Sequence, residues 1–144
     1  LPPLIYGNSF IEDFFQNKLD QSKDHFFQEI KDLKVSSHFL IKRDGGITQF
    51  VSVLNRAWHA GISSFKGREN CNDFSIGIEL EGTDTDSFEE NQYNSLVSLT
   101  NILMSEFSSI TVDRIIGHSD IAPGRKTDPG KGFDWYKFKD RITK

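Results

Sequence analysis

The densest group of reactive side chains lies in one loop near the C-terminal end of the sequence. Residues 117–130 read Gly-His-Ser-Asp-Ile-Ala-Pro-Gly-Arg-Lys-Thr-Asp-Pro-Gly. His118 and Asp128 offer a nitrogen and an oxygen donor of the kinds that bind zinc, and the loop between them could fold both onto one ion. The spacing alone leaves open a surface histidine and a turn-forming aspartate, because no His-x-Glu-x-x-His motif is present. Lys126 could reach a developing oxyanion, whereas we expect Arg125 to be solvated.

Two carboxylates lie at the end of an apolar segment in the middle of the chain. Glu79 belongs to the run 74–80, where burial would raise its pKa toward the range of a general base. Glu81 follows two positions later and shares a strand face with Glu79 if the strand continues that far. The spacing does not choose between them, and a solvated carboxylate at a strand edge is the alternative for Glu79.

Two histidines and a tryptophan could also contribute to a site. His38 begins an apolar segment, and His59 lies in the sequence Ala-Trp-His-Ala-Gly. Each histidine could be a ligand, a base or a hydrogen-bonded core residue, of which the last is the commonest. Trp58 could stack on a sugar ring or pack at the rim of the core. The single cysteine, Cys71, cannot form an intramolecular disulfide, and we expect it to be a small buried side chain in a reducing compartment.

The composition limits the class of protein. With 144 residues and 36% hydrophobic content, the chain can bury one core, which predicts a single monomeric domain over residues 1–144. No apolar run approaches the roughly 20 residues of a membrane span. A net charge of −4 provides no field that would attract a polyanion, which argues against nucleic-acid binding as the main activity.

The N-terminal half must supply helices and a hairpin. Apolar residues spaced by three and four positions predict helices over residues 8–19 and 22–33. Residues 38–42 and 47–51 are rich in β-forming side chains, and the segment 43–46 between them contains Asp-Gly, which is typical of a hairpin turn.

The C-terminal half of the sequence predicts two further strands and two further helices. A strand over residues 74–80 should lie at the centre of the sheet. Ser87 and Glu90 resemble a capping box at the start of an amphipathic helix that ends near Phe107. The rest should form a strand over 110–116, an irregular segment over 117–132 and a helix over 135–142. The expected fold is therefore α/β (α+β), with a mixed central β-sheet flanked by helices.

Three segments together resemble a known family. Residues 72–85 read Asn-Asp-Phe-Ser-Ile-Gly-Ile-Glu-Leu-Glu-Gly-Thr-Asp-Thr, and residues 56–61 read Arg-Ala-Trp-His-Ala-Gly. With the loop 117–130, they closely resemble the AmpD-type 1,6-anhydro-N-acetylmuramoyl-L-alanine amidases. These belong to the zinc amidase family that includes peptidoglycan recognition proteins and phage lysozyme-amidases. The similarity runs from Leu1 to near the C-terminus and implies the fold of that family.

The resemblance also implies a reaction. It suggests that His118 and Asp128 bind Zn²⁺, that Glu79 activates the zinc-bound water, and that Lys126 stabilises the oxyanion. The bond cleaved joins N-acetylmuramic acid to L-alanine in peptidoglycan fragments. The substrate would be a small anhydromuropeptide, recycled from the cell wall in the cytoplasm. We expect the substrate to contact residues around the site: Lys34, His38, Trp58, His59 and Asn70.

The sequence departs from the family pattern in two places. A third zinc ligand, a histidine, is expected upstream of Leu1, so we interpret the chain as an amidase domain that lacks its N-terminal strand. Two protein ligands alone should bind zinc poorly and give little turnover. Lys34 and Asn70 stand where relatives carry arginines, and lysine cannot form the bidentate contact that arginine makes with a carboxylate. The peptide preference is therefore open.

Three other functions compete with this hypothesis. A non-catalytic module could bind muropeptides after losing a metal ligand, and an extracellular lytic amidase could act on intact peptidoglycan. A structural or interaction protein would leave the loop 117–130 unexplained. The presence of Glu79, Lys126, His118 and Asp128 together favours an enzyme.

Overall fold

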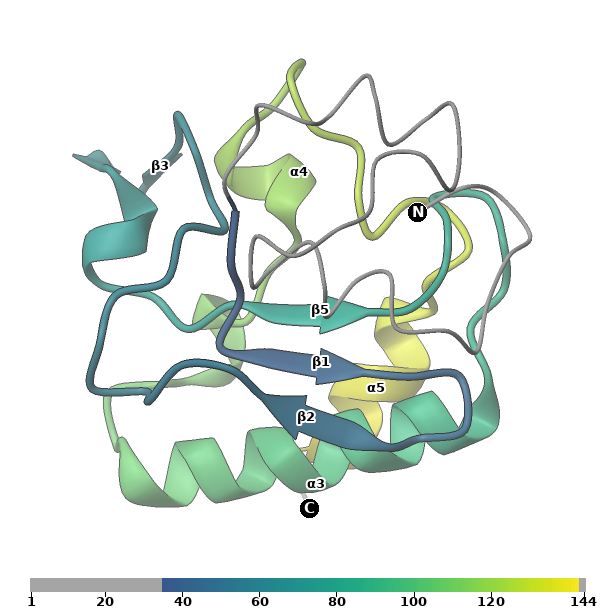
Figure 1. Cartoon of the computed structure of the whole chain (residues 1–144). Helices are drawn as coiled ribbons and strands as arrows, with labels where there is room; N and C mark the ends of the chain where they lie inside the picture. The colour runs from purple at the N-terminus through teal and green to yellow at the C-terminus, as the bar shows by residue number, and fades with distance from the viewer. Residues whose placement is uncertain (1–34, 143–144) are drawn as a thin grey trace, which may run out of the picture.

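The computed structural model of the chain describes residues 35–142 (Figure 1). The helices expected over residues 8–19 and 22–33 lie outside the described residues. Along the described part the elements are β1 (Phe39–Ile41), β2 (Ile47–Gln49), β3 (Ser64–Phe65), β4 (Arg68–Glu69), the 3-10 turn η2 (Cys71–Asp73), β5 (Ile78–Leu80), α3 (Glu90–Glu106), the 3-10 turn η3 (Val112–Arg114), α4 (His118–Ile121) and α5 (Trp135–Ile142).

A mixed three-stranded sheet forms the centre of the described residues. Its strand order is β2-β1-β5, with β1 antiparallel to β2 and parallel to β5. The predicted hairpin is confirmed, and Gly45 takes a φ of +88° in its turn, a conformation that glycine adopts without strain. Within the described residues, β5 covers only the end of the strand expected over residues 74–80 and has one partner in the sheet. Here β1 lies between its two partners, and all its residues are buried.

Two helices cover the sheet and build the core with it. Figure 1 shows α3 running beneath the sheet with α5 beside it. The buried apolar side chains of these elements form one cluster, which includes Phe39, Ile41, Tyr93, Leu96, Leu99, Leu103, Phe133, Phe138 and Ile142. Phe138 is only 2% exposed, and burial of such a side chain contributes about 1.5–3 kcal/mol. The predicted C-terminal helix is confirmed.

The start of α3 differs from the expected capping box. Its N-cap is Glu89, not Ser87, and the Gln92 side chain accepts the Glu89 backbone N–H at 3.0 Å. The same buried Gln92 amide donates to the carbonyl of Ile41 at 3.3 Å and to that of Glu81 at 3.0 Å. One side chain therefore caps the helix and ties it to the ends of β1 and β5, which fixes where the helix begins.

The structure differs from the sequence-based expectations in two segments, residues 110–116 and the β3–β4 hairpin. The strand predicted over residues 110–116 is wrong, because the segment contains η3, whose backbone N–H groups bond locally to carbonyls three residues earlier. Its apolar side chains, Ile110, Val112 and Ile115, still pack against the core. The β3–β4 hairpin was missed. Its turn has positive φ at Lys66 and Gly67, a hairpin signal that a Lys-Gly pair gives only weakly.

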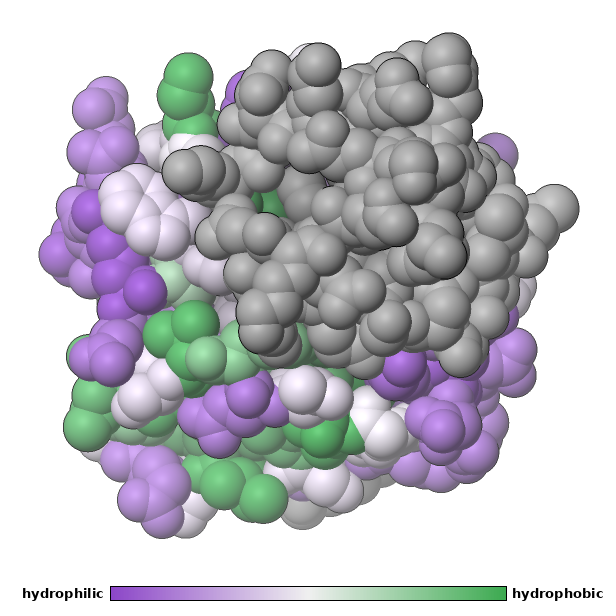
Figure 2. Space-filling view, viewed as in Figure 1, coloured by the Kyte–Doolittle hydropathy of each residue, from purple (hydrophilic) through white to green (hydrophobic). Residues whose placement is uncertain are grey.

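Polar and apolar side chains are distributed unevenly over the surface. In Figure 2, hydrophilic side chains gather at the left around β3, whereas hydrophobic and hydrophilic side chains are mixed lower down, where α3 lies. Two exposed large apolar side chains, Ile47 and Ile102, belong to β2 and α3. Within residues 35–142, no helix has the length and apolar character needed to cross a membrane.

Candidate active site

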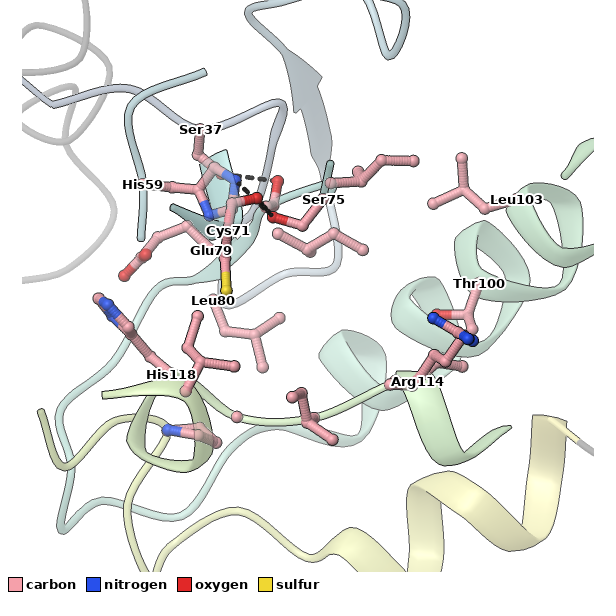
Figure 3. Close-up of a pocket in the computed structure, with 18 of the residues that line it drawn as sticks. Ser37, His59, Cys71, Ser75, Glu79, Leu80, Thr100, Leu103, Arg114 and His118 are labelled. Atoms are coloured by element: carbon pink, nitrogen blue, oxygen red, sulfur yellow. Dashed lines mark hydrogen bonds between the residues drawn. The ribbon is translucent and has the colours of Figure 1, made fainter. Parts of the chain in front are cut away.

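A cavity of about 780 Å³ extends from the last strand of the sheet toward α3. Its polar end is lined by His59, Glu79, His118 and Asp128, and its far end includes Leu103. Figure 3 shows the Glu79 carboxylate and the His118 ring on the same side of this cavity, with Thr100 and Leu103 on the opposite side. The chemistry expected from the sequence is therefore concentrated at one end of a space with apolar walls.

The His118 and Asp128 side chains face each other. Nδ1 of His118 lies 3.2 Å from Oδ2 of Asp128, and Nε2 donates to the Ala60 carbonyl at 2.9 Å. Two donors that each bind a tetrahedral zinc ion at about 2.0–2.1 Å lie about 3.3 Å from each other. The pair therefore has the spacing of two ligands of one ion, and the bond to Ala60 leaves Nδ1 as the ligating nitrogen. Among the described residues, no group of three or more His, Cys, Asp or Glu side chains could hold a metal.

The electrostatics of the pair are those of a coupled acid and base. The hydrogen bond to Asp128 raises the pKa of His118, although partial burial opposes the shift. Burial acts against ionisation of Asp128, but the hydrogen bond and charge of His118 outweigh it and lower the pKa of that carboxyl. Asp128 is therefore an anion ready to bind a cation.

The backbone of the loop brings the two donors together. α4 begins at His118, and Gly117 before it donates its N–H to the Asp120 carboxylate at 2.8 Å. Ser119 N–H donates to the Asp128 carbonyl at 3.0 Å and joins the two ends of the loop. A Cβ on Gly117 would approach Pro129 Cδ to 2.8 Å, so the close contact requires glycine.

The structure separates the two carboxylates that the sequence could not distinguish. The Glu79 carboxylate faces the cavity, and although the residue is exposed at its mouth, the protein atoms packed around the carboxylate remove part of its hydration. This desolvation, followed by the negative charge of Asp128, raises the pKa of Glu79 to about 7. Glu81 is 1% exposed and accepts the Arg43 backbone N–H at 3.0 Å. The two do not share a face, because β5 ends at Leu80.

His38 is part of the core. It is completely buried, Nε2 donates to the Asn55 carbonyl at 2.7 Å, and Nδ1 accepts the Gly77 N–H at 3.1 Å. Both nitrogens are used, so His38 offers no surface to a substrate. Its ring lies 5.8 Å from that of His59, in an edge-on arrangement.

His59 reaches the polar end of the cavity through a gap left by a glycine. A Cβ on Gly77 would lie 2.5 Å from Cγ of His59, so only glycine fits beneath the ring. Burial, together with the neighbouring His38 and His118, lowers the pKa of His59 to about 4. His59 is therefore neutral at pH 7 and can serve as a hydrogen-bonding group but not as a cation.

The remaining predicted residues lie further out. Trp58 is 57% exposed, and the Arg56 guanidinium lies 4.1 Å from the centre of its ring. Asn70 is exposed and has a left-handed φ of +57° before η2. Lys126 is exposed, and its charge opposes protonation of His118 and favours ionisation of Asp128, so the ammonium lies within electrostatic reach of both. Lys34 lies outside the described residues.

Two residues near the site were not recognised from the sequence. Asn72 is buried, and its Oδ1 accepts the backbone N–H groups of His59 and Ala60 at 3.0 and 2.8 Å. Arg125 was expected to be solvated, but its guanidinium donates to the carbonyls of Ala60 and Ile62. Cys71 is buried, as expected.

Comparison with known families identifies the family of the chain. Residues 8–131 match the family model described as N-acetylmuramoyl-L-alanine amidase. The matched segment contains Glu79, His118 and Asp128 and covers most of the chain. The chain belongs to the N-acetylmuramoyl-L-alanine amidase family.

Individual relatives show which members of that family the chain resembles. The chain is 54% identical over 142 residues to the 1,6-anhydro-N-acetylmuramyl-L-alanine amidase AmpD of Haemophilus influenzae, covering 99% of this chain and 77% of that protein. A crystal structure of a selenomethionine AmpD derivative matches with a TM-score of 0.95 and 48% identity, over 98% of this chain and 78% of the other. The expected resemblance to AmpD-type amidases and the amidase fold are confirmed.

A more distant structure includes a substrate. The amidase AmiD from E. coli, in complex with anhydro-N-acetylmuramic acid-L-Ala-D-gamma-Glu-L-Lys, matches with a TM-score of 0.70. Its identity to this chain is 32%, over 82% of this chain and 52% of the other. A relative of the same fold therefore binds a muropeptide as a small molecule.

Proposed function

We propose that the protein is a zinc-dependent amidase that hydrolyses the bond between 1,6-anhydro-N-acetylmuramic acid and L-alanine in muropeptides. The observation that supports this most strongly is that Glu79, His118 and Asp128 line the same end of one cavity. There, a carboxyl with a pKa raised to about 7 faces the same space as the paired His118 and Asp128. The similarity to AmpD amidases gives the substrate class.

The donor types and the spacing of His118 and Asp128 fit a zinc ion. His118 and Asp128 are the two ligands that the described residues would supply to the ion. When bound, zinc lowers the pKa of a water molecule and polarises the amide carbonyl. A bound cation would also lower the pKa of Glu79 from about 7 and favour its basic form.

The side chains of this chain would carry the proton transfers. Glu79 takes a proton from the attacking water while the water oxygen forms a bond to the lactyl carbonyl carbon. The Lys126 ammonium stabilises the negative charge that develops on the carbonyl oxygen. Glu79 then returns the proton to the nitrogen of L-alanine as the carbon–nitrogen bond breaks. The products are a free lactyl carboxylate and a peptide with a free amino terminus.

Substrate contacts are proposed at the rim. Trp58 presents a partly exposed ring, and neutral His59 lies deeper in the cavity. Asn70 and Lys34 would meet the peptide stem, where their difference from arginine alters preference for its carboxylates. We place the reaction in the cytoplasm, as for recycling amidases, and propose that the protein acts as a monomer.

Hydrolysis of a defined muropeptide tests this function. The protein should release tripeptide from anhydromuramyl tripeptide, as measured by chromatography. A chelator should abolish the release, and added zinc should restore it. Binding without hydrolysis would instead indicate a non-catalytic module, and preferential cleavage of intact sacculi would indicate a lytic enzyme.

A further inference from the structure

One backbone carbonyl receives hydrogen bonds from two functionally different side chains. The Ala60 oxygen accepts Nε2–H of His118 at 2.9 Å and an Nη2–H of Arg125 at 2.7 Å. A carbonyl oxygen has two lone pairs, so the two bonds use its full capacity. The orientation of the His118 ring is therefore linked to the position of a guanidinium group.

Arg125 holds this segment at more than one point. Its Nη2 also donates to the Ile62 carbonyl at 2.8 Å, and its Nε donates to the same oxygen at 3.2 Å. The approach depends on Gly61, which has a φ of +63° and where a Cβ would lie 2.9 Å from Nη2. The guanidinium thus spans two carbonyls across a residue that cannot carry a side chain without displacing it.

The opposite side of the same peptide segment is also fixed. The Ala60 N–H donates to Oδ1 of buried Asn72 at 2.8 Å, and the His59 N–H donates to the same oxygen at 3.0 Å. With Asn72 on the N–H groups and Arg125 on the carbonyls, residues 59–62 are held from both sides. The hydrogen bond from Ala60 to His118 therefore has a defined direction.

We infer that Arg125 is a positioning residue that fixes the tautomer and direction of His118 by holding the Ala60 carbonyl. This inference rests on the proposed role of His118 as a metal ligand. A ligating histidine donates its second ring nitrogen to an acceptor, and loss of such outer contacts weakens metal binding by about 10–100-fold. Arg125 is exposed, so water can replace part of its contacts, and the effect belongs at the lower end of that range.

Zinc titration of an Arg125→Gln variant of the whole protein tests the inference. The zinc dissociation constant, measured by competition with a chelating dye, should rise about tenfold. In metal-free protein at a pH well above the ordinary histidine pKa of about 6.5, nitrogen NMR should show one His118 tautomer in the parent protein and a mixture in the variant. KM for the muropeptide at saturating zinc should be unchanged.

Matched variants make each outcome decisive. Arg141→Gln also removes a guanidinium but lies on α5, bound to Glu90, and should leave zinc affinity unchanged. If Arg125→Gln does not fold, Arg125→Lys keeps the charge without the fork that spans two carbonyls, and it should still weaken zinc binding. Zinc affinity within about twofold of the parent, or a raised KM alone, would overturn the inference. If His118→Ala also left zinc binding intact, the proposed function itself would fail.

Discussion

The chemistry of single residues depends on where the charged form of each is tolerated. Glu79 is the one carboxyl of the polar end whose pKa is raised, to about 7, whereas that of Asp128 is lowered and that of His59 falls to about 4. In the proposed mechanism these three groups act as a proton acceptor, an anionic ligand and a neutral hydrogen-bonding residue. Such separation of pKa values within one cavity is what general acid–base chemistry requires.

Glu79→Gln should separate proton transfer from metal binding. Glutamine keeps the shape of the side chain but cannot accept a proton, so kcat should fall by about 10²–10⁴-fold. Zinc content, measured by elemental analysis, should stay at the parent value, because the ligands are untouched. Glu89→Gln, which removes an exposed carboxylate at the start of α3, provides a control with parent activity. A Glu79→Gln enzyme of near-normal rate would remove Glu79 as the base.

Residue roles were only partly predictable from sequence. The loop containing His118 and Asp128 was identifiable, because its donor types lie close together in the chain. The choice between Glu79 and Glu81 was not, since it depends on the end of β5. The role of His38 depends on acceptors and donors 17 and 39 positions away, which no local pattern reports.

At the scale of elements, the contact between α3 and α5 joins the two ends of the described core. Glu90, the first residue of α3, forms ion pairs with Lys137 and Arg141 of α5. The hydrogen bonds from Lys137 and then Arg141 lower the pKa of Glu90 below its ordinary 4.5. Because the folded-state pKa is depressed, the stabilisation is present above the unfolded pKa and is lost as the pH falls through the folded value.

Glu90→Gln should therefore lower the thermal midpoint at pH 7 but have less effect in acid. The difference between parent and variant should shrink as the pH falls from about 4.5, the unfolded-state value, through the lower pKa of Glu90 in the folded parent. Circular dichroism melts over a pH series would measure it. Added salt should also reduce the difference, because the pair is exposed to solvent. A difference that grows in acid would contradict the assignment.

Elements were predictable where a long periodic pattern existed. The span of α3 and the first hairpin follow from apolar spacing and turn residues. The start of α3 does not, because Gln92 bonds to β1 and β5, which are distant in sequence. The segment around η3 was misread because its β-forming residues Ile110, Val112 and Ile115 pack against the core without forming a strand.

At the scale of the whole molecule, the connection from β5 to α3 packs directly against the C-terminal segment. Gly130 has a φ of +78°, and a Cβ there would lie 2.0 Å from the Asp84 carbonyl oxygen. A Cβ on Gly132 would lie 1.9 Å from the Asp86 carbonyl oxygen. The loop that carries Asp128 thus packs against the backbone that follows Glu79, and this contact fixes the proposed ligand relative to the proposed base.

Two glycines with the same φ allow the contribution of this close contact to the free energy of unfolding to be measured. Gly124 also has a φ of +78°, but a Cβ there would contact nothing within 4 Å. Gly124→Ala should cost only the left-handed conformation, about 1–2 kcal/mol. Gly130→Ala should cost about 1–3 kcal/mol more, because the backbone must shift to admit the methyl group. Urea unfolding of both variants would measure the difference, and equal losses would show that the close contact contributes nothing.

The hydrogen bond and the packing contact that join the two ends of the loop 117–130 affect the entropy cost of the proposed ion binding. Bringing together chain positions about ten residues apart costs a flexible chain about 2 kcal/mol of entropy in the length-dependent part alone. Here the Ser119 N–H bond to the Asp128 carbonyl and the contact of Gly117 with Pro129 hold the loop closed. That ordering occurs when the chain folds, so under the proposed zinc binding the two donors would not lose the same conformational entropy again.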